Sequence, residues 1–348
     1  MRKFNYTALK NMKWDSEMMR YVAIIHEMRG KQTLYLRQKP EALDKLVEIA
    51  KVQSTESSNE IEGIRTTNTR LKQLVSERTT PKNRDEQEIA GYRDALAVIH
   101  ESFEYIPLTP NYLLQLHKIL YSHSALDVGG KFKNVHNYIS ATDSEGKQFT
   151  LFTPHSPYET PDMISELCDE FNRAVAECEV DPLILIPIFI HDFLCIHPFL
   201  DGNGRMSRLL TTLLLYRSGY MVGKYISLEA KIAKNKNLYY DALELSQTEW
   251  YEGNDDPTPF IKYLLGTIIS AYRDFEERMD IVSDTNSAMD IVAKAVETRI
   301  GKFTKADIAA LCTSISTSSV ESSLKKLARN GFIEKHGNGR ATFYTRNV

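Results

Sequence analysis

Apolar residues recur along most of the chain at the three- and four-residue spacing that is typical of amphipathic helices. Leu43, Leu46 and Ala50 follow this pattern ahead of Gly63, a residue that is favoured just past a helix end. The helices predicted in this way are the segment from Leu43 towards Gly63, Asp85–Glu104, Leu113–Tyr121, Thr160–Cys178, 182–196, Arg205–Ser218, Asn235–Glu244, Thr304–Leu311 and Ser316–Asn330.

Prolines mark two of these helix starts, since proline at the first helical position lacks only an N–H group that would go unused there. Thr160 is the candidate N-cap before Pro161. Asp181 is the candidate N-cap before Pro182, which opens a helix that is apolar along most of its length. Pro187 inside that helix predicts a kink.

Residues 135–154 differ from the helical pattern around them. They contain β-prone runs on both sides of Ser144-Glu145-Gly146, a sequence that favours a hairpin turn. A single hairpin in a helical chain is a candidate flap rather than part of a core sheet. The predicted fold class is therefore mainly α.

The composition changes after about residue 283. Residues 285–348 carry ten Lys and Arg against five Asp and Glu, a net charge of +5, which leaves −8 for the residues before them. The polar run 283–287 is the predicted linker. We expect an N-terminal helical region over 1–108, a central core over 109–282 and a separate C-terminal domain over 285–348.

The whole chain has the composition of a folded soluble protein. Its 348 residues carry a net charge of −3, which excludes a uniformly basic nucleic-acid coat. The four cysteines form no CxxC pair, and three lie in apolar helical patterns, which predicts free thiols in a reducing compartment. The longest apolar stretch, Leu183–Ile190, is shorter than the roughly 20 residues of a membrane span. We expect a cytoplasmic protein with no membrane partner.

The stretch His197–Arg208 joins two predicted helices and has the residue types of a phosphate-binding site. Gly202 and Gly204 let the backbone approach a ligand closely, with amides at the start of the next helix available to an anion. Arg205 and Arg208 project from one face of that helix, so both guanidinium groups can hold a polyphosphate.

Three other side chains of this loop suit chemistry on a bound phosphate. Asp201 is a candidate Mg²⁺ ligand, because Mg²⁺ is held by one or two carboxylates together with phosphate oxygens. Asn203 can cap the following helix or contact phosphate oxygens. His197 is the side chain of this loop whose ordinary pKa suits proton abstraction near neutral pH.

These twelve residues resemble, without a mismatch, the signature HxFx(D/E)GNGRxxR of the Fic family, whose known members mostly transfer AMP from ATP to a hydroxyl side chain of a target protein. The resemblance implies that His197 deprotonates the target hydroxyl and that Asp201 holds Mg²⁺. It assigns nucleotide binding to Asp201, Gly202, Asn203, Gly204, Arg205 and Arg208, with Arg208 on the γ-phosphate.

A second motif, Ser58-Asn59-Glu60-Ile61-Glu62-Gly63, matches the inhibitory pattern (S/T)xxxE(G/N) of the same family. Glu62 is expected at the C-terminal end of its helix, where the helix dipole disfavours a carboxylate and a cation is needed. The resemblance implies inhibition by Ser58, Glu62 and Gly63, with Glu62 occupying Arg208 in place of the nucleotide. A solvated Glu before a helix-ending glycine is the alternative.

Three further features follow from the resemblance. Fic proteins hold an extended target segment on a hairpin flap by strand addition, although a surface hairpin without a docking role fits the sequence equally well. Tyr239-Tyr240 matches an aromatic pair that relatives place around adenine, and such a pair is also typical of a helical core. Lys133 stands where relatives often have arginine, which leaves its role open. The predicted docking strand consists of Gln148, Phe149, Thr150, Leu151 and Phe152.

The C-terminal pattern of helix, turn, helix and hairpin resembles a winged helix. Protein docking or dimerisation competes with DNA contact there, because a net charge of +5 is modest. The candidate phosphate contacts are Lys325, Lys326, Arg329, Arg340 and Arg346.

The sequence therefore predicts a protein adenylyltransferase that uses ATP and Mg²⁺, is inhibited in cis by Glu62, and modifies a Ser, Thr or Tyr hydroxyl of a target or of itself. Two other functions stay open. One is a related phosphotransferase or an enzyme that removes AMP. The other is a nucleotide-sensing regulator that binds DNA, and a homodimer is compatible with each.

Overall fold

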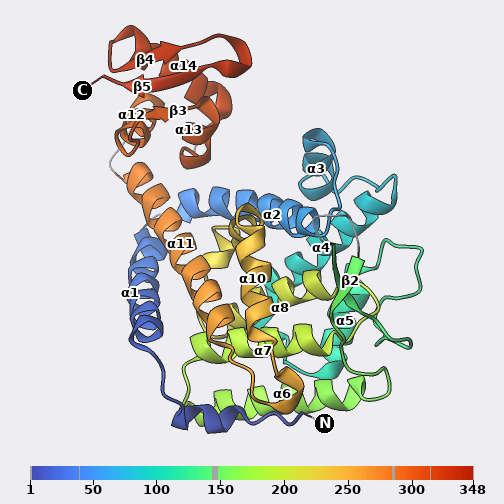
Figure 1. Cartoon of the computed structure of the whole chain (residues 1–348). Helices are drawn as coiled ribbons and strands as arrows, with labels where there is room; N and C mark the ends of the chain where they lie inside the picture. The colour runs from blue at the N-terminus through green and yellow to red at the C-terminus, as the bar shows by residue number, and fades with distance from the viewer. Residues whose placement is uncertain (1, 39, 143–147, 284–286, 314, 348) are drawn as a thin grey trace.

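The computed structural model describes residues 2–38, 40–142, 148–283, 287–313 and 315–347, and these residues are mostly helical (Figure 1). The helices are α1 (Ser16–Gln38), α2 (Pro40–Ile61), α3 (Asn68–Val75), α4 (Arg84–Ser102), α5 (Pro110–Leu120), α6 (Thr160–Glu177), α7 (Pro182–Ile196), α8 (Asn203–Arg217), α9 (Leu228–Lys234), α10 (Lys236–Ser246), α11 (Thr258–Ser283), α12 (Ala288–Glu297), α13 (Lys305–Leu311) and α14 (Thr317–Arg329). The strands are β1 (Ile139–Thr142), β2 (Gln148–Phe152), β3 (Lys302–Phe303), β4 (Ile333–His336) and β5 (Phe343–Arg346).

The helices predicted from the hydrophobic pattern are present, with ends shifted by a few residues. Asp181 caps α7 by accepting from the Leu183 N–H at 2.8 Å, and Pro187 lies inside that helix, as predicted. The prediction that Thr160 caps α6 is wrong. Thr160 is already the first helical residue, because its hydroxyl donates back to the Ser156 carbonyl at 2.8 Å and the preceding residue takes the cap position.

Helices α1, α3, α9, α11 and α12 were not predicted, although the sequence of α1 has the helical spacing of apolar residues. Met18, Val22 and Ile25 are buried at helical spacing. This apolar face of α1 packs against α11, and the two helices lie side by side in Figure 1. The long helix α11 then leads from the larger part of the molecule to the C-terminal part.

Helix α7 lies at the centre of the larger core. Every residue from Leu183 to Ile196 is buried, and burying each large apolar side chain contributes about 1.5–3 kcal/mol relative to exposure. One continuous apolar core reaches from Phe4 to Met279, so the N-terminal helices and the central helices pack together. A second core, from Ile291 to Tyr344, belongs to the C-terminal part.

Strands β1 and β2 form the predicted hairpin. They pair antiparallel, with Ser140 opposite Thr150 and Thr142 opposite Gln148. The predicted turn at 144–146 lies outside the described residues. The hairpin forms a two-stranded sheet of its own among the residues described, which fits its interpretation as a flap. Phe152 of β2 packs against the larger core.

The C-terminal part stands beyond the end of α11, at the top of Figure 1. Helices α12, α13 and α14 pack against a three-stranded antiparallel sheet with the order β3-β5-β4. Thr304 caps α13 in a reciprocal capping box with Asp307, and Ser316 caps α14. Both helix starts were predicted within one residue.

The cysteines are as predicted: Cys168, Cys195 and Cys312 are buried, Cys178 is exposed, and all four are free thiols. In the portion of the chain that is described, no helix combines the length and the apolar character needed to cross a bilayer. The cytoplasmic location stays a prediction.

Candidate functional site

The loop between α7 and α8 begins and ends in left-handed backbone. His197 directly follows α7 with φ 51° and ψ 61°, and Gly202 directly precedes α8 with φ 82°. A residue other than glycine in this region is uncommon, and such residues cluster at functional sites. The N–H groups in the first turn of α8 have no partner within the helix, which leaves them available to an anion.

Two asparagines fix the shape of this loop. The Asn203 side chain accepts from the Phe199 N–H at 2.9 Å and donates to the Phe199 carbonyl at 2.8 Å. Asn137 donates to the carbonyls of His197 at 3.1 Å and Phe199 at 3.0 Å. Both polar atoms of the Asn203 side chain are thus engaged inside the loop, although the resemblance assigns them to phosphate.

Lys133, whose role the sequence left open, caps the C-terminal end of α7 through a hydrogen bond to a backbone carbonyl. Its side chain is buried, and its Nζ donates to the Ile196 carbonyl at 3.0 Å and to Asn137 Oδ1 at 2.9 Å. Burial lowers the pKa of Lys133 to about 8. A lysine therefore suffices where relatives often carry arginine, because the acceptors are one carbonyl and one amide rather than a carboxylate.

His117 is a functional-site neighbour that the sequence analysis missed. Its ring stacks on Phe199 with 3.8 Å between centroids, and its Nε2 donates to the Asp201 carbonyl at 3.0 Å. Its Nδ1 accepts from the Gly130 N–H at 3.1 Å, which fixes the tautomer. A single histidine on the buried face of α5 gives no signal that separates it from an ordinary core residue.

The geometry of His197 suits a general base. Its Nδ1 lies 3.1 Å from the Leu194 carbonyl, which can only accept, so Nδ1 carries the proton and Nε2 carries the lone pair. Burial lowers the pKa of His197 to about 4, so the ring is neutral at pH 7. A neutral imidazole with Nε2 unprotonated can take a proton from a hydroxyl group.

The loop borders a cavity of about 360 Å³, which is within the size range of small-molecule sites. Every residue that the sequence analysis assigned to catalysis or nucleotide binding lines this cavity. These residues are Glu62, His197, Asp201, Gly202, Asn203, Gly204, Arg205, Arg208, Tyr239 and Tyr240.

Glu62 pairs with Arg208, as the second motif suggested. Arg208 is 3% exposed, and its Nη2 donates to Glu62 Oε1 at 2.7 Å. The same guanidinium donates to the Ser58 hydroxyl at 2.8 Å and to the Ser58 carbonyl at 2.9 Å. A Cβ atom placed on Gly204 would overlap Glu62 Oε1. The Glu62 carboxylate therefore lies over the first turn of α8, where an anion would bind.

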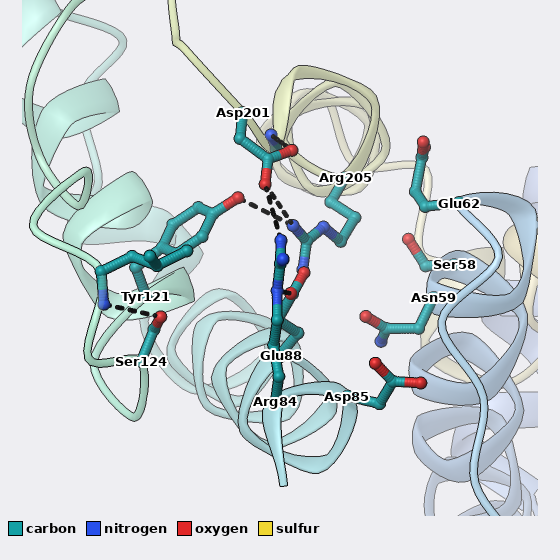
Figure 2. Close-up of polar contacts among 12 residues, drawn as sticks. Ser58, Asn59, Glu62, Arg84, Asp85, Glu88, Tyr121, Ser124, Asp201 and Arg205 are labelled. Atoms are coloured by element: carbon teal, nitrogen blue, oxygen red, sulfur yellow. Dashed lines mark hydrogen bonds and ion pairs between the residues drawn. The ribbon is translucent and has the colours of Figure 1, made fainter.

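Arg205 is held from the side opposite Glu62 (Figure 2). It is 2% exposed, with Nη1 2.8 Å from Glu88 Oε2 and Nη2 donating to the Tyr121 hydroxyl at 2.8 Å. Its Nε is buried and has no hydrogen-bond partner within the described ranges. Glu88 and Tyr121 carry no motif, so the sequence analysis did not identify them.

Asp201 presents a carboxylate at the cavity, with Oδ2 3.9 Å from Arg84 Nη2 and 4.0 Å from Arg205 Nη2. One oxygen accepts from the Gly202 N–H at 2.7 Å, and the side chain is half-exposed at the cavity. His191, Asp192 and Asp255 also lie within reach of one another, but Arg2 already bonds both carboxylates there. Asp201 is therefore the residue of this site that fits Mg²⁺, an ion that keeps several water and phosphate ligands.

The two aromatic residues of α10 differ in exposure. Tyr239 is buried and packs against Phe260 and Tyr263 in the core. Both residues line the cavity, but Tyr240 is 41% exposed and Tyr239 only 4%, so Tyr240 offers more of its ring to a ligand. From the predicted docking strand, Leu151 also lines the cavity.

Residues 107–215 match the model of the Fic/DOC family. The chain is 24% identical over 147 residues to a Fido domain-containing protein of Dictyostelium discoideum, covering 41% of this chain and 98% of that protein. It is 26% identical over 140 residues to the protein adenylyltransferase fic-1 of Caenorhabditis elegans, covering 39% of this chain and 25% of that protein. The chain thus spans about a quarter of that relative's length.

The fold is similar to the crystal structure of a Fic family protein from Desulfovibrio desulfuricans G20, with a TM-score of 0.61, 20% identity and 97% of each chain covered. The matched residues 107–215 include the loop, the hairpin and helices α5 to α7 together with most of α8. Residues 107–215 are thus similar in sequence to the Fic/DOC family, and the fold is similar to that of a Fic family protein.

Proposed function

We propose that this chain is a protein adenylyltransferase that transfers AMP from Mg-ATP to a Ser, Thr or Tyr hydroxyl of a protein target. The observation that carries the proposal is the convergence, at one cavity, of a neutral histidine, a half-exposed carboxylate and two buried arginines at a helix N-terminus. The adenylyltransferase among its relatives supports the same activity.

In this reaction the target hydroxyl oxygen attacks the α-phosphorus of ATP, and the bond from that phosphorus to the bridging oxygen breaks. Pyrophosphate leaves, and the hydroxyl proton passes to His197 Nε2. The Leu194 carbonyl holds the ring through Nδ1, so the acceptor nitrogen is fixed before the substrate arrives. Positioning of this kind and electrostatic stabilisation supply most of the rate in phosphoryl-group chemistry.

The phosphates would lie against the first turn of α8, with Arg205 and Arg208 as their cations. Gly204 leaves room there, since a side chain on it would fill the cradle. Asp201 would hold Mg²⁺, which neutralises charge on the phosphate oxygens when bound. The exposed ring of Tyr240 would face the adenine.

We also propose that Glu62 inhibits this activity in cis. Its carboxylate accepts a hydrogen bond from Arg208 and occupies the space over Gly204. A γ-phosphate placed there would lack this Arg208 donor and would be repelled by the negative charge of Glu62. Lys236 Nζ donates to the Ile61 carbonyl at 2.5 Å and thereby holds the end of α2 in this position.

The target would bind along β2 by strand addition, which brings its hydroxyl to His197. Leu151 of that strand already borders the cavity. Without a target, a segment of a second copy can take its place, and self-labelling is then the measurable activity.

Labelling with ATP that carries a radioactive α-phosphate tests the proposal. The Glu62→Gly variant is expected to transfer label to protein, and Glu62→Gly combined with His197→Ala is expected not to. Full labelling in the double variant would refute the role of His197. Transfer of label from the γ-phosphate instead would favour a phosphotransferase, and loss of AMP from a modified protein would favour the reverse activity.

We further propose that residues 285–348 contact DNA phosphates, supported by lysines and an arginine that are exposed on α14 and β4. Lys325 pairs with Glu321 at 2.9 Å and Arg346 donates to the Glu297 carbonyl at 3.2 Å, while the Arg340 side chain lies outside the described residues. Lys326→Glu with Arg329→Glu in the full chain is expected to abolish a salt-sensitive DNA mobility shift. An unchanged shift would favour protein docking.

A further inference from the structure

Helix α4 carries a carboxylate that is shared by two arginines beside the candidate site. Glu88 is 4% exposed, and its Oε1 accepts from Arg84 Nε at 2.8 Å. Its other oxygen lies 2.8 Å from Arg205 Nη1. Arg84 is one helical turn before Glu88, and its side chain is 66% exposed at the edge of the site. Figure 2 shows Glu88 between the two guanidinium groups, with Asp201 facing both of them.

Asp201 and Glu88 compete for the same guanidinium. Arg205 follows Asp201 by four residues, an arrangement that favours an ion pair along a helix start. The two groups nevertheless stay 4.0 Å apart, and Arg84 Nη2 likewise stays 3.9 Å from the same Asp201 oxygen. Glu88 takes the closer contact with each arginine.

This arrangement leaves Asp201 half-exposed, with both arginines at 3.9–4.0 Å, beyond hydrogen-bonding distance of its carboxylate. A carboxylate closely paired with a guanidinium is a poorer metal ligand, because the cation must first be displaced. A buried Arg205 without Glu88 would in turn need another anion, since an uncompensated buried charge is costly. Asp201 is the nearest carboxylate that could supply it.

We propose that Glu88 is a positioning residue that keeps Arg205 away from Asp201, so that Arg205 stays available to phosphate and Asp201 stays open to a divalent cation. The inference rests on the proposed function, which assigns phosphate to Arg205 and Mg²⁺ to Asp201. Glu88 touches neither ligand and lies outside residues 107–215, which match the family model.

Binding of Mn²⁺, as a spectroscopic substitute for Mg²⁺, tests this role. The free ion is followed by electron paramagnetic resonance in the presence of a non-hydrolysable ATP analogue, with Glu62→Gly as the parent. Glu88→Gln keeps the size of the side chain but removes its charge. It is expected to raise the Mn²⁺ concentration for half-saturation about tenfold, the effect of losing one charge-assisted contact.

Helix α4 offers a matched control. Glu86 is also 4% exposed and pairs with Arg70 at 2.6 Å, but neither residue borders the cavity. Glu86→Gln removes a comparable buried pair from the same helix and is expected to change Mn²⁺ binding less than twofold. A shift equal to that of Glu88→Gln would mean that both variants act through stability alone, and would overturn the inference.

Glu88→Asp serves as the conservative variant. It keeps the charge but shortens the side chain, so an intermediate shift of about threefold is expected. If Glu88→Gln does not fold, the test uses Glu88→Asp instead. Mn²⁺ binding by Glu88→Asp equal to that of the parent would then overturn the inference. Normal Mn²⁺ binding by the parent and by Glu88→Gln would overturn this inference alone. Absence of nucleotide-dependent Mn²⁺ binding in the parent would overturn the proposed function as well.

Discussion

Replacing Glu62 by glycine is expected to make the protein more active and less stable at the same time. Glu62 supplies one of three hydrogen bonds to Arg208, and Ser58 supplies the other two. Without Glu62, Arg208 is free for a phosphate, and the space over Gly204 opens. The buried guanidinium also loses its counter-charge, which destabilises the protein in the absence of nucleotide.

The size of both effects follows from that one contact. A hydrogen bond to a charged group contributes about 1.5–3 kcal/mol. Because the Glu62 side chain is one-third exposed, water screens the pair, and we take the lower end of that range. About 1.5 kcal/mol corresponds to roughly a tenfold gain in apparent ATP affinity, and the free energy of unfolding falls by a similar amount.

Glu60→Gly is the matched control. Glu60 stands at the same end of α2 but pairs with the exposed Arg65 at 3.1 Å, away from Arg208. Glu60 lies in the last turn of α2 and Glu62 directly follows the helix, so both variants place a glycine at this helix end, and only Glu62→Gly frees Arg208. Self-labelling with α-labelled ATP and thermal unfolding with and without ATP measure the two effects. Equal labelling rates for the two variants would refute the reasoning, as would a Glu62→Gly protein that ATP does not stabilise.

Three further predictions concern other parts of the structure. Burial lowers the pKa values of His100 to about 3 and of His117 and His191 to about 4, so the unfolded chain binds protons between about pH 6.5 and pH 4 that the folded protein does not. Stability, measured by urea unfolding, should therefore fall as pH drops through this window, and constant stability would contradict it. Lys133→Met leaves the Ile196 carbonyl without its donor and is expected to cost about 1–3 kcal/mol of stability, with Lys133→Arg costing less in the same thermal melts. Tyr240→Ala should weaken ATP binding about tenfold in calorimetry without unfolding the protein, whereas Tyr239→Ala should cost about 3–5 kcal/mol of stability because Tyr239 is buried.

Much of the fold can be read from local signals. The apolar spacing, the cap at Asp181 and the glycines after helices predicted helices close to those observed. These signals act within one or two turns, so they survive without knowledge of the rest of the chain. Thr160 shows the limit, because its hydroxyl had two possible partners and the sequence does not choose between them.

The signature residues could also be predicted, since the chemistry resides in residue types at fixed spacing along one loop. Their individual orientations could not. Asn203 turns both polar atoms of its side chain to the Phe199 backbone. Tyr239 and Tyr240 both border the cavity, but Tyr239 is buried and Tyr240 is exposed. Adjacent residues on a helix point in different directions, and packing against neighbouring helices decides which of them reaches a ligand.

The sequence by itself determined where many of the helices lie, which loop carries the chemistry, and that an inhibitory motif stands upstream. Only the tertiary structure decided which distant groups meet. Ser58 and Arg208 are 150 residues apart. Glu88, Tyr121 and His117 contact the loop or the first turn of α8 from segments without a motif. In the sequence, a polar residue that contacts the site from a helix cannot be distinguished from an ordinary polar residue of a helix. Its role depends on a partner that is brought close by helix packing, which sums many weak contacts over the whole core.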